Sequence, residues 1–196
     1  NVMCHIPYIN SIAEGIKVLL KPGGIAVFED PYLGDVIRNT TYDQIYDEHT
    51  FLFSVHSVQY LFSQIDMEVI EVEPQDTHGG SMRYFIAAKG VRPIGESVQM
   101  QLQVERTLGL TSPETFDCFR EKCERYRVEL INLLRAVKSQ SKSIAGYAAT
   151  SKSTTIINYC GITTEHLDCI YDTTPIKIGR YSPGAHIPIV DHAEFR

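Results

Sequence analysis

The chain has 196 residues, of which 43% are hydrophobic and 21% charged, and its formal net charge at pH 7 is −6. A chain of this length and composition can bury an ordinary hydrophobic core without disulfides or structural metal ions. The negative charge argues against a nucleic-acid-binding or anionic-membrane-binding surface, and no apolar run approaches the ~20 residues of a membrane-spanning helix. We therefore expect a globular protein with no nucleic-acid partner and no membrane partner.

The five cysteines are scattered and form no C-x-x-C pair, and the sequence has no H-x-x-x-H motif. Neither a disulfide framework nor a metal site is therefore predicted. Free thiols are typical of a reducing compartment, so we expect a cytoplasmic protein. The cysteines are Cys4, Cys118, Cys123, Cys160 and Cys169.

The first ninety residues alternate between helical and strand patterns. Apolar residues at helical spacing predict two helices, the second capped by Ser54. A continuous apolar run predicts a strand of the kind that a parallel sheet buries on both faces, and two segments of period two predict an antiparallel pair. The predicted helices span residues 7–20 and 55–65, and the predicted strands span 25–28, 67–73 and 82–88.

A segment rich in glycine and proline at 89–96 predicts a domain boundary. Two amphipathic helices and a second α/β unit follow. The predicted helices span 98–108, 113–137 and 150–159, and the predicted strands span 143–148, 167–172 and 187–190. Both chain ends, at Asn1 and Arg196, lead us to expect a piece of a longer chain.

Residues 42–49 hold the densest group of chemically active side chains: two phenols, three carboxylates and an imidazole. If this segment is helical, one face carries the residues at spacing i, i+3, i+4 and i+7, which are Tyr42, Ile45, Tyr46 and His49. The histidine would then be a general base beside a phenolic hydrogen-bond donor. The alternative is an amphipathic stripe that merely packs on the core.

A second candidate site is the strand, loop and helix start of residues 143–155. Several hydroxyls and Lys152 stand at the helix entrance, where free N–H groups and the helix dipole favour anions such as phosphate. The segment is neither a Walker loop nor a full G-x-G-x-x-G motif, because Ala148 and Ser153 replace glycines. A well-capped helix without a ligand is the alternative. Further charge for the same anion would come from a later basic loop, through Lys177, Arg180 and Tyr181.

Residues 78–81, His-Gly-Gly-Ser, are similar to the backbone oxyanion holes of lipases. The chain has no G-x-S-x-G nucleophile, so we reject a hydrolase. The glycines permit either a tight turn with close approach to a ligand or an ordinary hairpin turn.

Seven segments together resemble one family, the S-adenosylmethionine-dependent sugar C-methyltransferases that act on nucleotide-linked keto-deoxysugars. The resemblance covers nearly the whole chain. In order, the segments are residues 1–7 (NVMCHIP), 20–24 (LKPGG), 46–49 (YDEH), 78–81 (HGGS), 146–152 (GYAATSK), 158–162 (NYCGI) and 177–184 (KIGRYSPG).

The resemblance implies a reaction in which a base removes the proton next to a sugar ketone and the enolate carbon attacks the sulfonium methyl. His49 is the implied base, with Glu48 and Tyr46 stabilising or orienting the enolate and the sugar. The implied sugar-nucleotide contacts are His78, Ser151, Lys152, Arg180 and Tyr181, and the implied cofactor contacts are Asn1 and His5.

Members of that family are longer. They begin with a cysteine-rich zinc module and continue into the glycine-rich loop that holds S-adenosylmethionine, and this sequence contains neither. We therefore expect an α/β fold in three parts: the back half of a Rossmann-like methyltransferase domain (1–90), a helical arm (91–140) and part of a second Rossmann-like domain (141–196).

The expected function is C-methylation of a keto-deoxysugar linked to a nucleotide of the deoxythymidine type (dTDP), with this chain as part of the enzyme. One alternative keeps the methyltransferase fold but changes the acceptor to a small non-sugar metabolite. The other is a non-catalytic structural or interaction fragment.

Overall fold

The computed structural model describes residues 1–195, which form two compact units divided between Phe119 and Arg120. The first unit contains, in chain order, η1 (Met3–His5), α1 (Ile9–Leu19), β1 (Ala26–Pro31), α2 (Leu33–Asn39), η2 (Tyr42–Gln44), α3 (Val55–Ser63), β2 (Met67–Gln75), η3 (Thr77–Gly79), β3 (Ser81–Ala88) and α4 (Glu96–Leu108). Helix α5 (Pro113–Lys138) crosses the division, and β4 (Ala145–Tyr147), α6 (Ser151–Cys160), β5 (Cys169–Asp172), β6 (Ile189–Asp191) and η4 (His192–Glu194) follow. The expected α/β fold is confirmed.

The sheet of the first unit has the strand order β1-β3-β2, and β3 is antiparallel to both neighbours. The antiparallel pair predicted for β2 and β3 is confirmed. The expectation that β1 lies in a parallel sheet and is buried on both faces is wrong. Its described partner is β3, and Val27 is 52% exposed. Strand β3 lies between β1 and β2. Because it is antiparallel to both, β1 and β2 run in the same direction but do not pair with each other.

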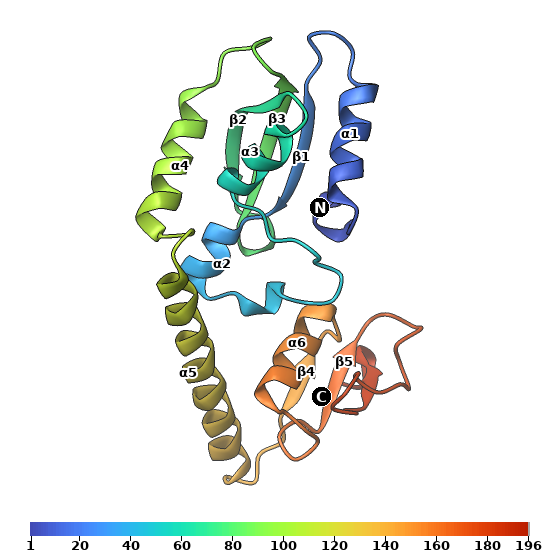
Figure 1. Ribbon diagram of the computed structural model, residues 1–196. Coiled ribbons are helices and arrows are strands. Elements are labelled where there is room, and N and C mark those ends of the chain that lie inside the picture. Colours follow the sequence, from blue (N-terminus) through green and yellow to red (C-terminus); the bar gives the residue numbers. More distant parts are fainter. Residues whose placement is uncertain (196) are drawn as a thin grey trace. The chain divides into compact units, whose positions relative to one another are not determined.

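Helices α1, α3 and α4 pack around one core with the sheet (Figure 1). The core-facing residues of β3, Met82, Tyr84 and Ile86, are fully buried and alternate with residues of the other face. Phe28 of β1 stacks on Tyr84, with 4.8 Å between ring centroids. The helices predicted at 7–20 and 55–65 are confirmed as α1 and α3. Their apolar stripes face this core.

A buried carboxylate holds the start of α3. Glu105 of α4 is only 4% exposed, and it accepts hydrogen bonds from the backbone N–H groups of Val55 (2.5 Å) and His56 (3.0 Å) and from the Tyr32 hydroxyl (3.0 Å). The positive end of the helix dipole offsets the buried negative charge. Ser54 completes the cap by accepting from the backbone N–H of Ser57, as its predicted capping role requires.

The second unit contains a three-stranded parallel sheet, in the order β4-β5-β6. Thr150 caps α6 through a capping box with Ser153, and Gly161 ends the helix in the left-handed conformation, at φ 70°. Side chains of α5 pack on the core of this unit, through Leu130, Ile131 and Leu134. The predicted strand-helix-strand arrangement is confirmed.

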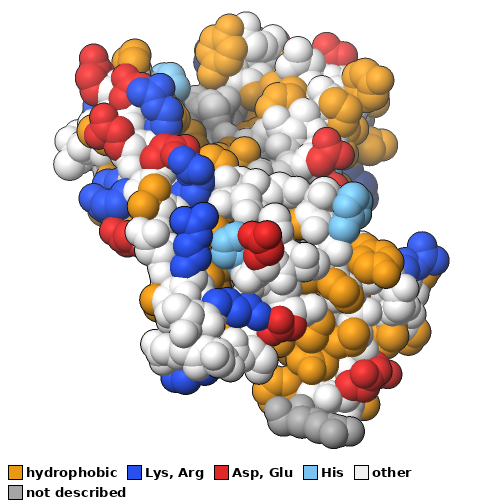
Figure 2. Space-filling view, turned by 90° about the horizontal axis from the view of Figure 1, so that it is seen from below, with side chains coloured by type: hydrophobic (Ala, Val, Ile, Leu, Met, Phe, Trp, Pro, Cys, Tyr) orange, Lys and Arg blue, Asp and Glu red, His pale blue; other side chains and the backbone are white. Residues whose placement is uncertain are grey.

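Helix α4 packs on β2 and α3 and so belongs to the first unit. The predicted domain division at residues 90 and 140 stays a proposal. On the face seen in Figure 2, Lys and Arg side chains are interspersed with Asp and Glu. None of the helices within residues 1–195 combines the length and apolar character needed to cross a membrane.

Substituting Glu105 by alanine would leave the buried donors of Val55, His56 and Tyr32 without their acceptor. We expect the free energy of unfolding of the first unit to fall by about 2–4 kcal/mol, measured by urea denaturation. Gln99→Ala, at an exposed position of the same helix, is the control and should change it by no more than about 0.5 kcal/mol. Equal stability of both variants would contradict the capping role of Glu105.

Candidate functional site

Residues 42–49 do not form the helix that their apolar and aromatic spacing left open. They form the 3₁₀ turn η2 and then a second turn that closes through a hydrogen bond from His49 N to Tyr46 O (2.9 Å). An α-helix would use the carbonyl of Gln44 to accept the backbone N–H of residue 48. Here that carbonyl lies 2.8 Å from His49 Nδ1, so the histidine side chain takes an acceptor that the helix would need.

The turn nevertheless brings the predicted base and phenol together. The Tyr46 hydroxyl lies 2.8 Å from His49 Nε2, and the ring centroids are 4.0 Å apart. A carbonyl can only accept, so Nδ1 carries the hydrogen that bonds to Gln44 O. In the neutral imidazole, Nε2 then holds the lone pair and accepts from the phenol. The geometry defines Nε2 as the basic nitrogen.

Glu48 is exposed and does not lie on a shared helical face with His49. Its negative charge acts on the neighbouring phenol. Burial raises the pKa of Tyr46, and the charge of Glu48 adds to the effect. Tyr46 therefore stays protonated at neutral pH and remains a hydrogen-bond donor.

His5 lies against His49 at the end of η1. The two imidazoles meet edge to face, with centroids 4.9 Å apart. Asp30, which is fully buried, accepts a hydrogen bond from Cys4 N (3.2 Å) and so holds this turn in place. The second carboxylate oxygen of Asp30, Oδ1, has no hydrogen bond within residues 1–195. The main-chain nitrogen of Asn1 lies 3.5 Å from it.

Cys4, His5 and His49 offer one potential metal-ligand atom each, all within 4.8 Å of one another. Both imidazole nitrogens of His49 already make hydrogen bonds. Burial, together with the nearby Asp30 carboxylate, raises the pKa of the Cys4 thiol to about 12, which opposes the thiolate that a metal requires. These residues fit the protein-internal contacts better than a metal ion.

The loop 77–80 lies beside this segment and contacts it through its backbone. The side-chain amide of Gln44 donates to the His78 carbonyl, while the His78 side chain is exposed. The loop is a tight turn between the paired strands β2 and β3, with His78 at φ 56° and Gly80 at φ 124°. A Cβ at Gly80 would overlap the Asp35 side chain, so the glycine permits close packing within the protein.

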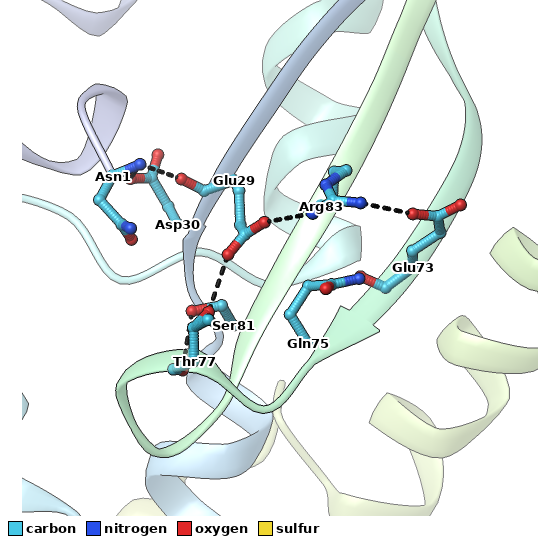
Figure 3. A network of polar contacts seen from close by, with 8 residues as sticks. All are labelled: Asn1, Glu29, Asp30, Glu73, Gln75, Thr77, Ser81 and Arg83. Carbon is cyan, nitrogen blue, oxygen red and sulfur yellow. Dashed lines mark hydrogen bonds and ion pairs between the residues drawn. The ribbon is translucent and has the colours of Figure 1, made fainter.

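A polar network anchors the same turn to the sheet (Figure 3). The Thr77 hydroxyl donates to Glu29 of β1 (2.8 Å). Arg83 of β3 bridges Glu29 (3.0 Å) and Glu73 of β2 (2.9 Å), to which it is paired directly across the strands. Ser81 donates to Thr77 O (3.1 Å). All three strands therefore fix the position of the turn.

The second cluster lies in the second unit, at the start of α6. A cavity of about 280 Å³ is lined by Ser151, Arg180 and Tyr181, three of the four residues predicted to bind substrate in this unit. Lys152 is not among its lining residues. Lys177 also lines it, but its ammonium group is held by Ala149 O (2.7 Å).

Asp172, at the end of β5, organises the walls of this cavity. Its carboxylate accepts from the backbone N–H groups of Thr174 (2.7 Å) and Ala149 (2.7 Å) and lies 3.4 Å from Lys177. These interactions, with the bonds to Thr174 first among them, hold the pKa of Asp172 far below its usual value. Ala148 adopts φ 71°, the conformation expected of the glycine that it replaces.

Some of the predicted site residues thus fall into one cluster in each unit, whereas Lys152 lies outside the cavity of the second unit. The first contains Tyr46 and His49, with His5 beside them. Sequence reasoning placed His5 towards the cofactor and gave no role to Gln44 or Asp172, because single polar residues carry no spacing signal. Gln44 and Asp30 both lie close to motifs that the sequence did mark.

Comparison with known proteins identifies the family. A family model described as "C-methyltransferase C-terminal domain" matches residues 76–196. The chain belongs to this C-methyltransferase family. It is also 34% identical, over 186 residues, to the protein named C-methyltransferase NovU from Streptomyces niveus. The aligned region covers 94% of the chain and 44% of NovU, so the chain spans less than half the length of that relative.

The Glu29 network predicts a pH-dependent contribution to stability. The hydrogen bond from Thr77, and then Arg83, lower the pKa of Glu29. A lowered folded-state pKa stabilises the protein above the unfolded-state pKa of about 4.3, and the contribution disappears as pH falls through the folded-state value. We expect Glu29→Gln to cost about 1 kcal/mol at pH 7 and progressively less below about pH 4.

Urea denaturation at several pH values measures this difference. Glu71→Gln removes an exposed carboxylate from the same sheet and is the matched control. A Glu29→Gln cost that stays constant from pH 7 to pH 3 would show that the carboxylate charge does not stabilise the turn.

Proposed function

We propose that the protein takes part in S-adenosylmethionine-dependent methylation of a carbon next to a ketone, on a nucleotide-linked deoxysugar. The observation that carries this proposal is the pairing of His49 Nε2 with the Tyr46 hydroxyl at 2.8 Å. A base and a hydrogen-bond donor side by side are what enolate formation requires.

The pair suggests how the proton is removed. A ketone oxygen that accepts the Tyr46 O–H replaces His49 as the phenol's acceptor, which frees the lone pair of Nε2 for the adjacent C–H. The phenol then donates to the oxygen on which negative charge develops, and Gln44 O stabilises the imidazolium through Nδ1. Glu48 is proposed to orient the sugar from the exposed side of the same turn.

S-adenosylmethionine, when bound, supplies the methyl group that the enolate carbon takes. Asn1 and His5 are proposed to face it, and the Asn1 nitrogen contacts Glu29 O at the end of β1. Neither residue lines the larger cavities of the first unit, which lie between α1 and α3 and beside α4.

The second unit is proposed to hold the phosphates of the nucleotide, of the dTDP type. The first N–H groups of α6, at Ser151 and Lys152, make no hydrogen bond within the described chain, whereas the capping box uses that of Ser153. Arg180 lines the same cavity and supplies a guanidinium suited to phosphate. His78 and Tyr181 are proposed as further contacts of the sugar nucleotide.

Replacing His49 by alanine removes the proposed base. In the full-length enzyme that contains this chain, we expect methyl transfer from S-adenosylmethionine to fall by about 10²-fold or more. Labelled methyl groups transferred to several dTDP-linked keto-deoxysugars would be counted. His56→Ala, at an exposed imidazole on α3, is the control and should keep full activity.

Full activity of His49→Ala would remove the base assignment. If the enzyme methylates only non-sugar ketones, the proposed acceptor class would be wrong and the assignment of His49 as the base would stand. Failure of the wild-type enzyme with every acceptor would favour the non-catalytic alternative.

Removing the charge of Arg180 tests the phosphate site. We expect Arg180→Met to weaken the binding of dTDP to this chain by about tenfold, because a charged hydrogen bond to phosphate is lost. Isothermal titration calorimetry measures the affinity. Arg135→Met removes an exposed guanidinium from α5 and is the charge-matched control; equal affinity in the two variants would place the nucleotide elsewhere.

A further inference from the structure

We propose that Gln44 is a positioning residue that ties the protonation state of His49 to the turn at 77–80. This inference rests on the proposed function of His49 as base. The Gln44 side chain donates to His78 O, and the Gln44 main-chain carbonyl accepts from His49 Nδ1 at 2.8 Å. One residue thus joins the turn to the imidazole.

The burial of Gln44 indicates that its amide serves a purpose other than core packing. The residue is 2% exposed, and its Oε1 has no hydrogen-bond partner within residues 1–195. An unsatisfied buried polar atom destabilises the folded state, and an apolar side chain of similar length would avoid that cost. The donor Nε2, which reaches His78 O, is the part of the side chain that methionine could not replace.

The acceptor at the other end is firmly fixed. His78 O belongs to a turn that Thr77 and Ser81 bind to the sheet, and Gly80 O accepts from Tyr32 N (3.1 Å). By contrast, the segment that carries the base has exposed residues at Ile45 and Glu48. Gln44 is therefore a point at which a surface turn is held to the rigid part of the unit.

The consequence for His49 is a choice of tautomer. While Gln44 O stays in line with Nδ1, that nitrogen carries the hydrogen and Nε2 keeps the lone pair that faces Tyr46. If the turn moves away, the imidazole returns to the Nε2–H form that histidine favours in water, and Nε2 can no longer accept a proton. Holding the carbonyl in place thus keeps the base ready to act.

The tautomer can be observed without any catalytic assay. Long-range ¹H–¹⁵N correlation spectra of the ¹⁵N-labelled chain, recorded above the pKa of the imidazole, distinguish the two protonated nitrogens. For the wild type we expect His49 protonated at Nδ1. For Gln44→Met we expect a majority of the Nε2–H form, whereas Gln64→Met, at an exposed position after α3, should leave the wild-type pattern.

Gln44→Asn provides a second test if the methionine variant fails to fold, because it keeps the amide but shortens its reach. We expect it to shift the tautomer in the same direction. In the full-length enzyme, both variants should lower kcat by roughly 10–100-fold with KM little changed, the pattern of a misdirected base.

An Nε2–H tautomer in the wild type, or an Nδ1–H tautomer in a folded Gln44 variant, would overturn the proposal. If His49→Ala keeps full activity but the Gln44 variants show the expected tautomer shift, His49 is not the base. The positioning of the imidazole by Gln44 would still stand.

Discussion

The position of β3 between β1 and β2 is the constraint on which the first unit depends. Because β3 pairs with both neighbours, its first residue, Ser81, lies at the end of β1, and the turn that precedes it is held there. Arg83 on this central strand reaches carboxylates on both sides. The same strand presents Tyr84 to the core on its other face. A single strand therefore joins the hydrophobic core to the polar support of the candidate site.

Buried polar groups in this protein lie where chain segments must be held in place. Glu105 secures the start of α3, Asp30 secures the turn that carries His5, and Asp172 secures the loops around α6. Each carboxylate accepts from backbone N–H groups, which are donors that would otherwise be unsatisfied. Burying such groups costs desolvation energy, and their hydrogen bonds hold the loops in a defined conformation.

The sequence predicted the helices and strands well where periodicity and caps agreed. Ser54 caps its helix as predicted, and the parallel strands of the second unit follow from the strand-helix-strand pattern. The apolar run of β1 gave the wrong pairing, since hydrophobicity does not specify which strand lies next to it. The segment 42–49 matched helical spacing, yet the His49 side chain competes for Gln44 O. Periodicity cannot reveal such competition, nor the distant partner of Gln44.

The contacts of His49 span very different lengths of chain. Its hydrogen bonds to Tyr46 and Gln44 join residues three and five positions apart, whereas the bond that anchors Gln44 closes a loop of 34 residues. Loop-closure entropy grows with length, so the two short contacts are accessible before the sheet has formed. The imidazole and its nearest partners can therefore meet in a largely unfolded chain, and the completed fold determines how long they remain together.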